Sequence, residues 1–154
     1  MGGENVRLLT GIKVLEKLEY DEFEIIDKIV FPSKFVAGDV LVKEGSHATS
    51  MFFVVEGTLE VITKKSDGSE VLMATISHGE SMGEMAFVAG FVRSATVRAK
   101  TDGMLLRLKH EDFKALMENH QTIGIKILEA MTILLSVTLR KTSKELTELM
   151  LSIA

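Results

Sequence analysis

The chain has 154 residues, of which 46% are hydrophobic and 26% charged, a length and composition that suit one globular domain with a single core. Its 22 acidic and 18 basic residues give a net charge of −4, which argues against a basic face for nucleic acid. The absence of cysteine excludes disulfides and thiolate metal sites. The first residues lack the basic and apolar parts of a signal peptide, and no apolar run reaches about 18 residues. We therefore expect a soluble, cytoplasmic protein without a membrane span.

Short helical segments are predicted at the N-terminus. Residues 6–18 place apolar and charged side chains at helical spacing, and Gly11 interrupts them. Residues 21–29 predict a helix with Phe23 and Ile26 on one side and Asp21 as its N-cap. We interpret residues 1–30 as N-terminal helices that cover one end of a barrel.

From Phe31 the hydrophobic period changes to two, which indicates strands. Turn signals such as Asp67-Gly68 and Asp102-Gly103 separate short apolar runs at residues 40–43, 51–55, 59–63, 71–76, 95–99 and 104–108. Many short strands with glycine-rich turns favour an antiparallel barrel or jelly roll. The predicted fold class is therefore α+β, with a jelly-roll-like antiparallel β-roll over residues 31–109 and helices before and after it.

Residues 110–154 return to a helical pattern. Phe113, Leu116 and Met117 share one face, and residues 122–153 predict a second, long helix. About 32 residues would span roughly 48 Å, which is more than a roll of this size can cover. Its apolar stripe, mostly at spacings of three or four, comprises Ile127, Met131, Leu134, Thr138, Leu146, Leu149 and Ile153. The stripe predicts a coiled-coil seam and a parallel homodimer, and the alternative is a helix on the surface of its own domain.

A single arginine interrupts the otherwise uncharged residues 85–97. A buried guanidinium is costly because it cannot lose its proton and must find an anion. Residues 83–89 predict a short helix closed by Gly90, and the free amides of its first turn can bind an anion. Arg93 returns toward this turn at the start of a strand. The arrangement predicts a phosphate site, and the first-turn carboxylate of Glu84 could accept bonds from sugar hydroxyls beside it.

Gly83-Glu84, a short helix and then Arg93-Ser94-Ala95 together resemble the phosphate-binding cassette of the cyclic nucleotide-binding domain family. The eight residues between Glu84 and Arg93 resemble the spacing in kinase regulatory subunits, and the residues after the arginine are similar to those of bacterial catabolite activators. The resemblance runs from about Asp21 to the C-terminus and places the cassette at residues 79–97. It implies a β-roll with helices at both ends and one cyclic nucleotide-binding domain over residues 1–154.

The resemblance implies a phosphate subsite. Arg93 and the backbone amides around Met85 and Ala86 would hold the cyclic phosphate. The hydroxyl of Ser94 would bond a phosphate oxygen, or Ser94 is simply a small core residue. Ala95 completes this part of the ligand-binding set.

The resemblance also implies a ribose subsite. Gly83 would let the backbone approach the sugar, and Glu84 would accept a hydrogen bond from the ribose 2′-hydroxyl. The alternative for Glu84 is a carboxylate that only stabilises the helix dipole, and the alternative for Arg93 is a structural salt bridge with Glu84 or Glu80.

The base would lie against the long helix. By resemblance, Thr138 falls where a catabolite activator has a threonine that contacts the adenine amino group, and Leu139 replaces a serine that reaches across the dimer. This position makes cAMP the expected ligand. A threonine hydroxyl can also donate to a guanine carbonyl, so cGMP is the alternative. Four residues would form the apolar wall around base and sugar, or are plain core packing: Val55, Met73, Ile76 and Met82.

The resulting hypothesis is a stand-alone cyclic nucleotide sensor that shifts its C-terminal helix on binding and acts on an unidentified protein effector. We expect no DNA binding, because the chain ends at Ala154 where catabolite activators continue into a DNA-binding segment. We also expect no enzyme activity, because the sequence contains no nucleophile elbow and no Walker loop.

Two alternatives remain open. One is a structural dimerisation module whose pocket is vestigial or holds another small anion. The other is a cupin-like metal oxygenase, which would need a histidine–carboxylate cluster. The four histidines are scattered and show no ligand spacing: His47, His78, His110 and His120.

Overall fold

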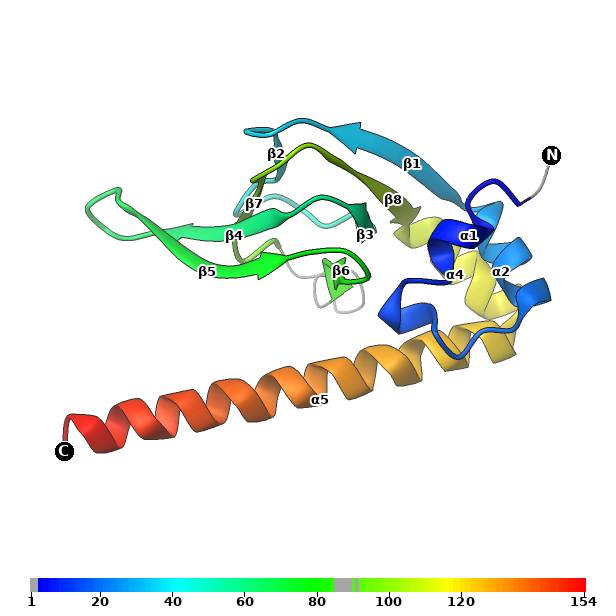
Figure 1. The fold of residues 1–154 in the computed structure, drawn as a ribbon. Helices are drawn as coiled ribbons and strands as arrows, with labels where there is room; N and C mark the ends of the chain where they lie inside the picture. Colours follow the sequence, from blue (N-terminus) through cyan, green and yellow to red (C-terminus); the bar gives the residue numbers. More distant parts are fainter. Residues whose placement is uncertain (1–2, 85–89, 91) are drawn as a thin grey trace.

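The structure is a computed structural model that describes residues 3–84, 90 and 92–154. Its strands form two four-stranded antiparallel sheets, which make a β-roll between short N-terminal helices and a long C-terminal helix (Figure 1). The first sheet has the order β1 (Val30–Phe35), β8 (Gly103–Lys109), β3 (Ser50–Glu56) and β6 (Ser81–Met82). The second has the order β2 (Val40–Val42), β7 (Thr96–Ala99), β4 (Leu59–Lys64) and β5 (Glu70–Ile76). The predicted fold class is confirmed.

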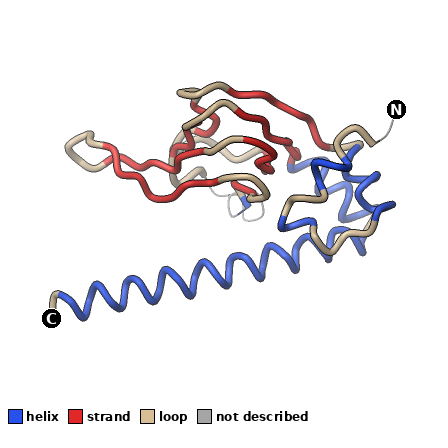
Figure 2. Tube along the Cα trace, viewed as in Figure 1, coloured by secondary structure: helices blue, strands red, loops and turns tan. Residues whose placement is uncertain are grey.

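The helices lie in two groups at the ends of the sequence (Figure 2). The first group comprises α1 (Val6–Leu9), a 3₁₀ turn η1 (Lys13–Leu15) and α2 (Tyr20–Asp27), and the second comprises α4 (His110–Asn119) and α5 (Gln121–Ser152). The short turns on either side of Gly11 and the long last helix are therefore as expected. The predicted N-cap at Asp21 is wrong: α2 follows Glu19, whose amide donates to Glu22 Oε1 at 2.9 Å. The two-residue strand β6 also escaped prediction, because so short an element has no period.

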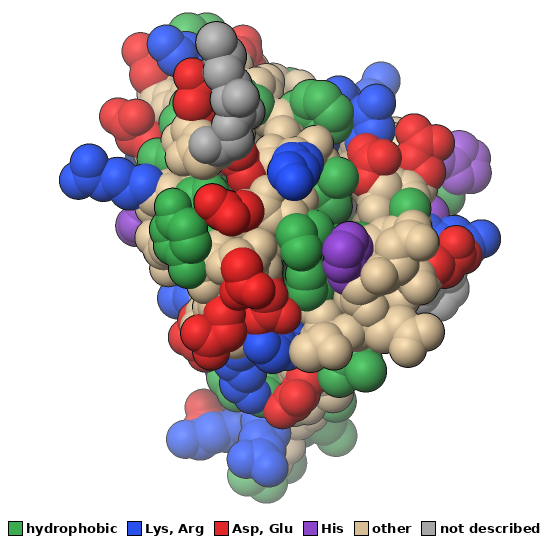
Figure 3. Space-filling view, turned by 90° about the vertical axis from the view of Figure 1, so that its right-hand side faces the viewer, with side chains coloured by type: hydrophobic (Ala, Val, Ile, Leu, Met, Phe, Trp, Pro, Cys, Tyr) green, Lys and Arg blue, Asp and Glu red, His purple; other side chains and the backbone are tan. Residues whose placement is uncertain are grey.

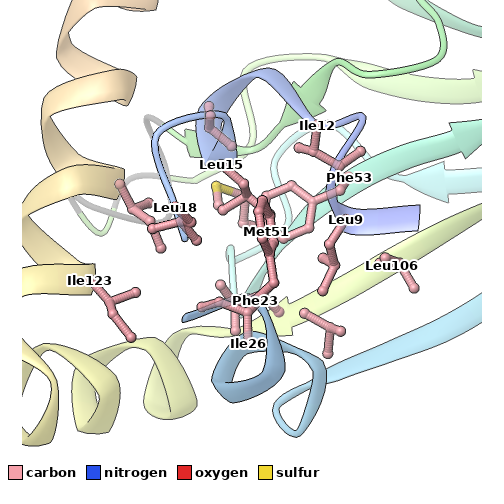
Figure 4. Packing of buried hydrophobic residues seen from close by; sticks show 14 of the residues in the cluster. Leu9, Ile12, Leu15, Leu18, Phe23, Ile26, Met51, Phe53, Leu106 and Ile123 are labelled. Carbon is pink, nitrogen blue, oxygen red and sulfur yellow. The ribbon is translucent and has the colours of Figure 1, made fainter. Parts of the chain in front are cut away.

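Strand alternation divides the core into two layers. On β3, Phe53 and Val55 point toward the N-terminal helices, whereas Val54 points between the two sheets. Figure 4 shows the helical layer, where Leu9, Ile12, Leu15 and Phe23 pack around Met51 and Phe53 of β3. The layer between the sheets includes Met82 at 5% exposure. The first sheet is thus covered by helices on one side and faces the second sheet on the other.

Helix α5 has a buried first third and an exposed remainder. Ile123, Ile127 and Met131 are buried in the helical layer. Gly124 lets α4 approach closely, because a Cβ there would lie 2.8 Å from Met117 Cγ. Several apolar side chains farther along are exposed: Ile133, Leu135, Val137, Leu139, Leu146, Leu149, Met150, Leu151 and Ile153.

The expectation that no apolar segment is long enough for a membrane span needs correction. Within the described residues, α5 has the length and apolar composition to cross a membrane. This is weak support for a span, because core helices of soluble proteins share these properties.

Ion pairs join α5 to the N-terminal helices. Lys126 Nζ lies 2.5 Å from Glu22 Oε1 of α2, and Lys17 Nζ lies 3.0 Å from Glu129 Oε1. Burial by itself raises the pKa of Glu22, but hydrogen bonds from Lys126 and the Glu19 amide, with the charge of Lys126, outweigh it and lower that pKa. Figure 3, which views the end carrying α1, α2 and α4, shows acidic and basic side chains intermixed on this face. The contacts here are paired charges rather than a patch of one sign.

The Glu22–Lys126 pair predicts an acid-sensitive attachment of α5. Because the folded-state pKa of Glu22 lies below its ordinary value of 4.5, its contribution to stability is present above pH 4.5 and is lost as pH falls through the folded-state value. Glu22→Gln removes this contribution. Urea unfolding at pH 7 and pH 3.5 should show that wild type loses more free energy of unfolding on acidification than Glu22→Gln does. The exposed Glu24→Gln serves as control and should behave like wild type; equal acid losses in all three proteins would contradict the assignment.

Candidate ligand-binding site

Described residues of the predicted cassette line a cavity of about 290 Å³. The segment after β6 contributes Gly83 and Glu84, and the segment before β7 contributes Arg93, Ser94 and Ala95. Apolar side chains from both sheets complete the wall: Val42, Val61, Ile76, Met82, Val92 and Val97, and Ser81 also lines it. Gly83 and Glu84 thus line the same cavity as Arg93 and its neighbours, about ten positions later in the chain.

Gly83 makes room for the guanidinium of Arg93. The backbone of Gly83 has φ +89°, a conformation that side chains disfavour, and a Cβ there would lie 2.2 Å from Arg93 Nη1. Both its conformation and its lack of a side chain are therefore required by this arrangement. The sequence identified this glycine from the motif, but the contact that explains it is visible only in the fold.

Arg93 is held by the β3 side of the roll. It is 7% exposed, its Nη2 donates to the carbonyl of Ser50 at 2.5 Å, and its Cζ lies 5.8 Å from the centre of the Phe52 ring. Its own backbone is fixed by exchanged bonds, from Arg93 N to Ser46 O and from Gly45 N to Arg93 O, both 2.8 Å. The guanidinium therefore has a defined position on the cavity wall.

The guanidinium of Arg93 has no ion pair among the described residues. No carboxylate oxygen of those residues lies within 4 Å of it, so neither Glu84 nor Glu80 forms the alternative salt bridge. Burial lowers the pKa of Arg93, and the carboxylate of Glu84 acts at longer range in the opposite direction. Because a guanidinium keeps its proton regardless, the cavity presents a charge that an anion would stabilise.

Glu84 lines the same cavity as Arg93. The hydroxyl of Ser81 donates a hydrogen bond to Glu84 Oε1. A carboxylate is an acceptor, so this wall suits the donors of a ligand, such as hydroxyl or amine groups, whereas Arg93 suits an anion. Ser81 was not among the predicted site residues; its place three residues before Glu84 was the one sequence signal that could have suggested it.

A second cavity of about 230 Å³ adjoins the first and lies between the roll and α5. Ile76, Ser81 and Glu84 line both cavities, and α5 adds Met131, Leu134, Leu135 and Thr138 to the second. Lys13 of η1, Thr75 and Glu80 complete its wall. Thr138 is exposed, and its hydroxyl donates to Leu134 O at 3.0 Å. Thr138 of α5 and Ser81 and Glu84 of the cassette thus line the same second cavity.

Two predicted wall residues lie elsewhere. Val55 packs into the helical core layer, because it has the same parity as Phe53 on β3. Met73 is 61% exposed on β5 and lines neither cavity, and it lies where the β4–β5 register shifts, because Val61 pairs with Ala74 and Ile62 with Leu72. Met85 and Ala86, and most of the predicted 83–89 helix, lie outside the described residues.

Among the described residues no group of three or more His, Asp or Glu side chains could hold a metal ion. The site is therefore a cavity with one cationic wall, one acceptor wall and an apolar lining. A cavity of this kind suits an anionic ligand that carries hydroxyl or amine donors.

Comparison with known proteins identifies the class. Residues 32–120 match the cyclic nucleotide-binding domain family, and the chain belongs to it. The chain is 28% identical over 109 residues to the cAMP-activated global transcriptional regulator CRP of Salmonella typhimurium, a match that covers 70% of this chain. That match covers 52% of the regulator, so the chain spans about half the length of the curated relatives it matches.

Solved structures agree on the fold. A cyclic nucleotide-binding domain from Methylobacillus flagellatus superposes with a TM-score of 0.83 at 20% identity, covering 94% of this chain and 85% of that one. A mutant regulatory subunit of a cAMP-independent protein kinase A from Trypanosoma brucei, bound to cAMP in its A site, gives 0.72 at 22% identity, covering 84% and 46%. At these identities the likeness establishes the roll and its helices.

Gly83→Ala should displace Arg93. The substitution imposes a strained backbone, about 1–3 kcal/mol, and places a methyl group on the guanidinium. Gly38→Ala is a matched control, because Gly38 has φ +94° and its added Cβ would meet no atom within 4 Å. Both variants should lose similar stability in urea, but only Gly83→Ala should lose cyclic nucleotide affinity in titration calorimetry. Equal affinities in the two variants would contradict the contact.

Proposed function

We propose that this domain is a cyclic nucleotide sensor that binds cAMP across the two adjoining cavities and repositions α5. The observation that carries the proposal is the buried guanidinium of Arg93, which lines a cavity and has no ion pair among the described residues. A cyclic phosphate supplies the missing negative charge in a geometry that an arginine fork can meet with two hydrogen bonds.

The remaining groups suit the other parts of this ligand. Glu84 would accept from the ribose 2′-hydroxyl, Gly83 makes room for the guanidinium of Arg93, and Ser94 would donate to a phosphate oxygen. The base would extend into the second cavity toward Thr138. One cavity alone lies at the lower limit of small-molecule sites, roughly 300–1,000 Å³, and the pair together falls within that range.

Output would pass through α5, because Thr138 lies on this helix while the cassette lies on the roll. A ligand that contacts both favours the arrangement in which both contacts are made, which is the requirement for a ligand-controlled two-state element. The exposed apolar side chains of α5, such as Leu139, Leu146 and Leu149, support a homodimer along this helix. The partner that receives the signal is proposed to be a cytoplasmic protein effector.

Titration calorimetry with cAMP and cGMP tests the function and its principal residue together. Wild type should bind at micromolar concentration or tighter. Arg93→Ala removes the cation and should weaken binding by about 3–5 kcal/mol, roughly 10²–10⁴-fold in affinity. Arg93→Lys keeps the charge but loses the planar fork, so it should retain only part of the affinity.

Arg98→Ala is the control for these variants. Arg98 lies on β7, bonds to Glu70 at 3.2 Å and lines neither cavity, so its loss should leave nucleotide affinity unchanged. Wild-type affinity in Arg93→Ala would show that the phosphate site is wrongly assigned. No heat from wild type with either nucleotide would favour the alternative of a dimerisation module with a vestigial pocket or a different small anion.

Thr138→Ala tests whether α5 selects the base. Loss of one hydrogen bond should cost about 1 kcal/mol of cAMP binding and change the cAMP:cGMP affinity ratio. Competition binding with both nucleotides measures this ratio. Thr132→Ala is the matched control, because its hydroxyl also donates to the carbonyl four residues earlier but faces neither cavity. An unchanged ratio in Thr138→Ala would remove the helix from base selection.

A further inference from the structure

Ser81 occupies the boundary between the two cavities. Strand β6 pairs with β3 through Phe52↔Met82 and Phe53↔Ser81, and Phe53 is fully buried, so the backbone of Ser81 is fixed to the first sheet. Alternation along β6 sends Met82 into the layer between the sheets and Ser81 to the opposite side. The side chain of Ser81 lines both cavities, as does that of Glu84.

Glu84 has two cations within its surroundings and pairs with neither. Arg93 lines the first cavity, Lys13 lines the second, and no ion pair joins either of them to Glu84. Lys13 instead lies 3.8 Å from Glu80. The hydroxyl of Ser81 donates to Glu84 Oε1. The partner of this carboxylate is therefore a neutral hydroxyl on a sheet strand, and neither Arg93 nor Lys13.

We propose that Ser81 is a positioning residue for the ribose contact: its hydroxyl holds Glu84 in the orientation that receives the 2′-hydroxyl of the ligand. This inference rests on the proposed function and deepens it. A carboxylate has about four acceptor positions, so one bond from Ser81 leaves Oε2 and part of Oε1 for the ligand. Ser81 therefore organises the acceptor without occupying it.

The energetic role is preorganisation. A free glutamate side chain must be ordered when the ligand binds, which costs about 0.5–1.5 kcal/mol, equivalent to roughly 2- to 10-fold in affinity. In the folded domain, Ser81 imposes that order before the ligand arrives. Because the effect operates through the 2′-hydroxyl, a ligand without this group gains nothing from it.

The test measures binding of cAMP and of its 2′-deoxy analogue to wild type, Ser81→Ala and Ser81→Thr by titration calorimetry. Ser81→Ala should bind cAMP about 2- to 10-fold more weakly and the 2′-deoxy analogue with unchanged affinity. The wild-type preference for cAMP over the analogue should shrink by the same factor. Ser81→Thr retains a hydroxyl and should restore the preference, since a β-branched residue suits a strand.

Ser77→Ala, an exposed serine that lines neither cavity, is the matched control and should leave both affinities unchanged. If Ser81→Ala weakens both ligands equally, Ser81 is a structural residue of the pocket and the proposal is overturned. Unchanged affinities for both ligands overturn it as well. In each of these cases wild type still binds cAMP and the proposed function stands, whereas wild type that binds neither ligand overturns the proposed function and this inference with it.

Discussion

The guanidinium of Arg93 is packed against Phe52, bonded to the carbonyl of Ser50 and almost removed from water, yet it has no ion pair among the described residues. Removing a charge from water is expensive unless an opposite charge compensates it. Several neighbouring residues nevertheless hold the arginine in this buried position. Gly83 adopts a left-handed conformation to make room, and Ser46 and Gly45 bond the arginine's backbone. An anion is the ligand that this set of constraints suits best.

A second feature is that the site is shared between two bodies of the fold. The first cavity belongs to the roll, while the second is closed on one side by α5. Ser81 and Glu84 belong to both, so a ligand that touches them can contact the roll and the helix together. The first third of α5 is fixed by Ile123 and Ile127 in the core and by the Glu22–Lys126 ion pair. Its remainder is exposed, so few contacts of its own chain hold it, and the proposed movement of α5 concerns this part.

Local patterns were sufficient for most of the fold. The change of hydrophobic period at Phe31 and again after Lys109, with glycine turns between, located both C-terminal helices and six strands within a few residues: β2, β3, β4, β5, β7 and β8. No apolar run had marked β1 (Val30–Phe35). The cassette residues Gly83, Glu84 and Arg93 followed from a motif whose members lie within eleven positions. Val55 lies away from the cavities because its side of the sheet is covered by helices, and Met73 is exposed where the β4–β5 register shifts. Short sequence patterns mark neither feature.

The amino-acid sequence by itself determined the order and type of most elements, the identity of the candidate phosphate-binding cassette and the presence of one arginine in an otherwise uncharged segment. These properties depend on residue types and short spacings. The tertiary structure decided which groups surround that arginine, that Glu84 bonds to Ser81 rather than to a cation, and that Lys13, Ser81 and Thr138 face one region. Such contacts join residues up to about 125 positions apart, and no local pattern encodes them because sheet pairing and helix packing set the distances.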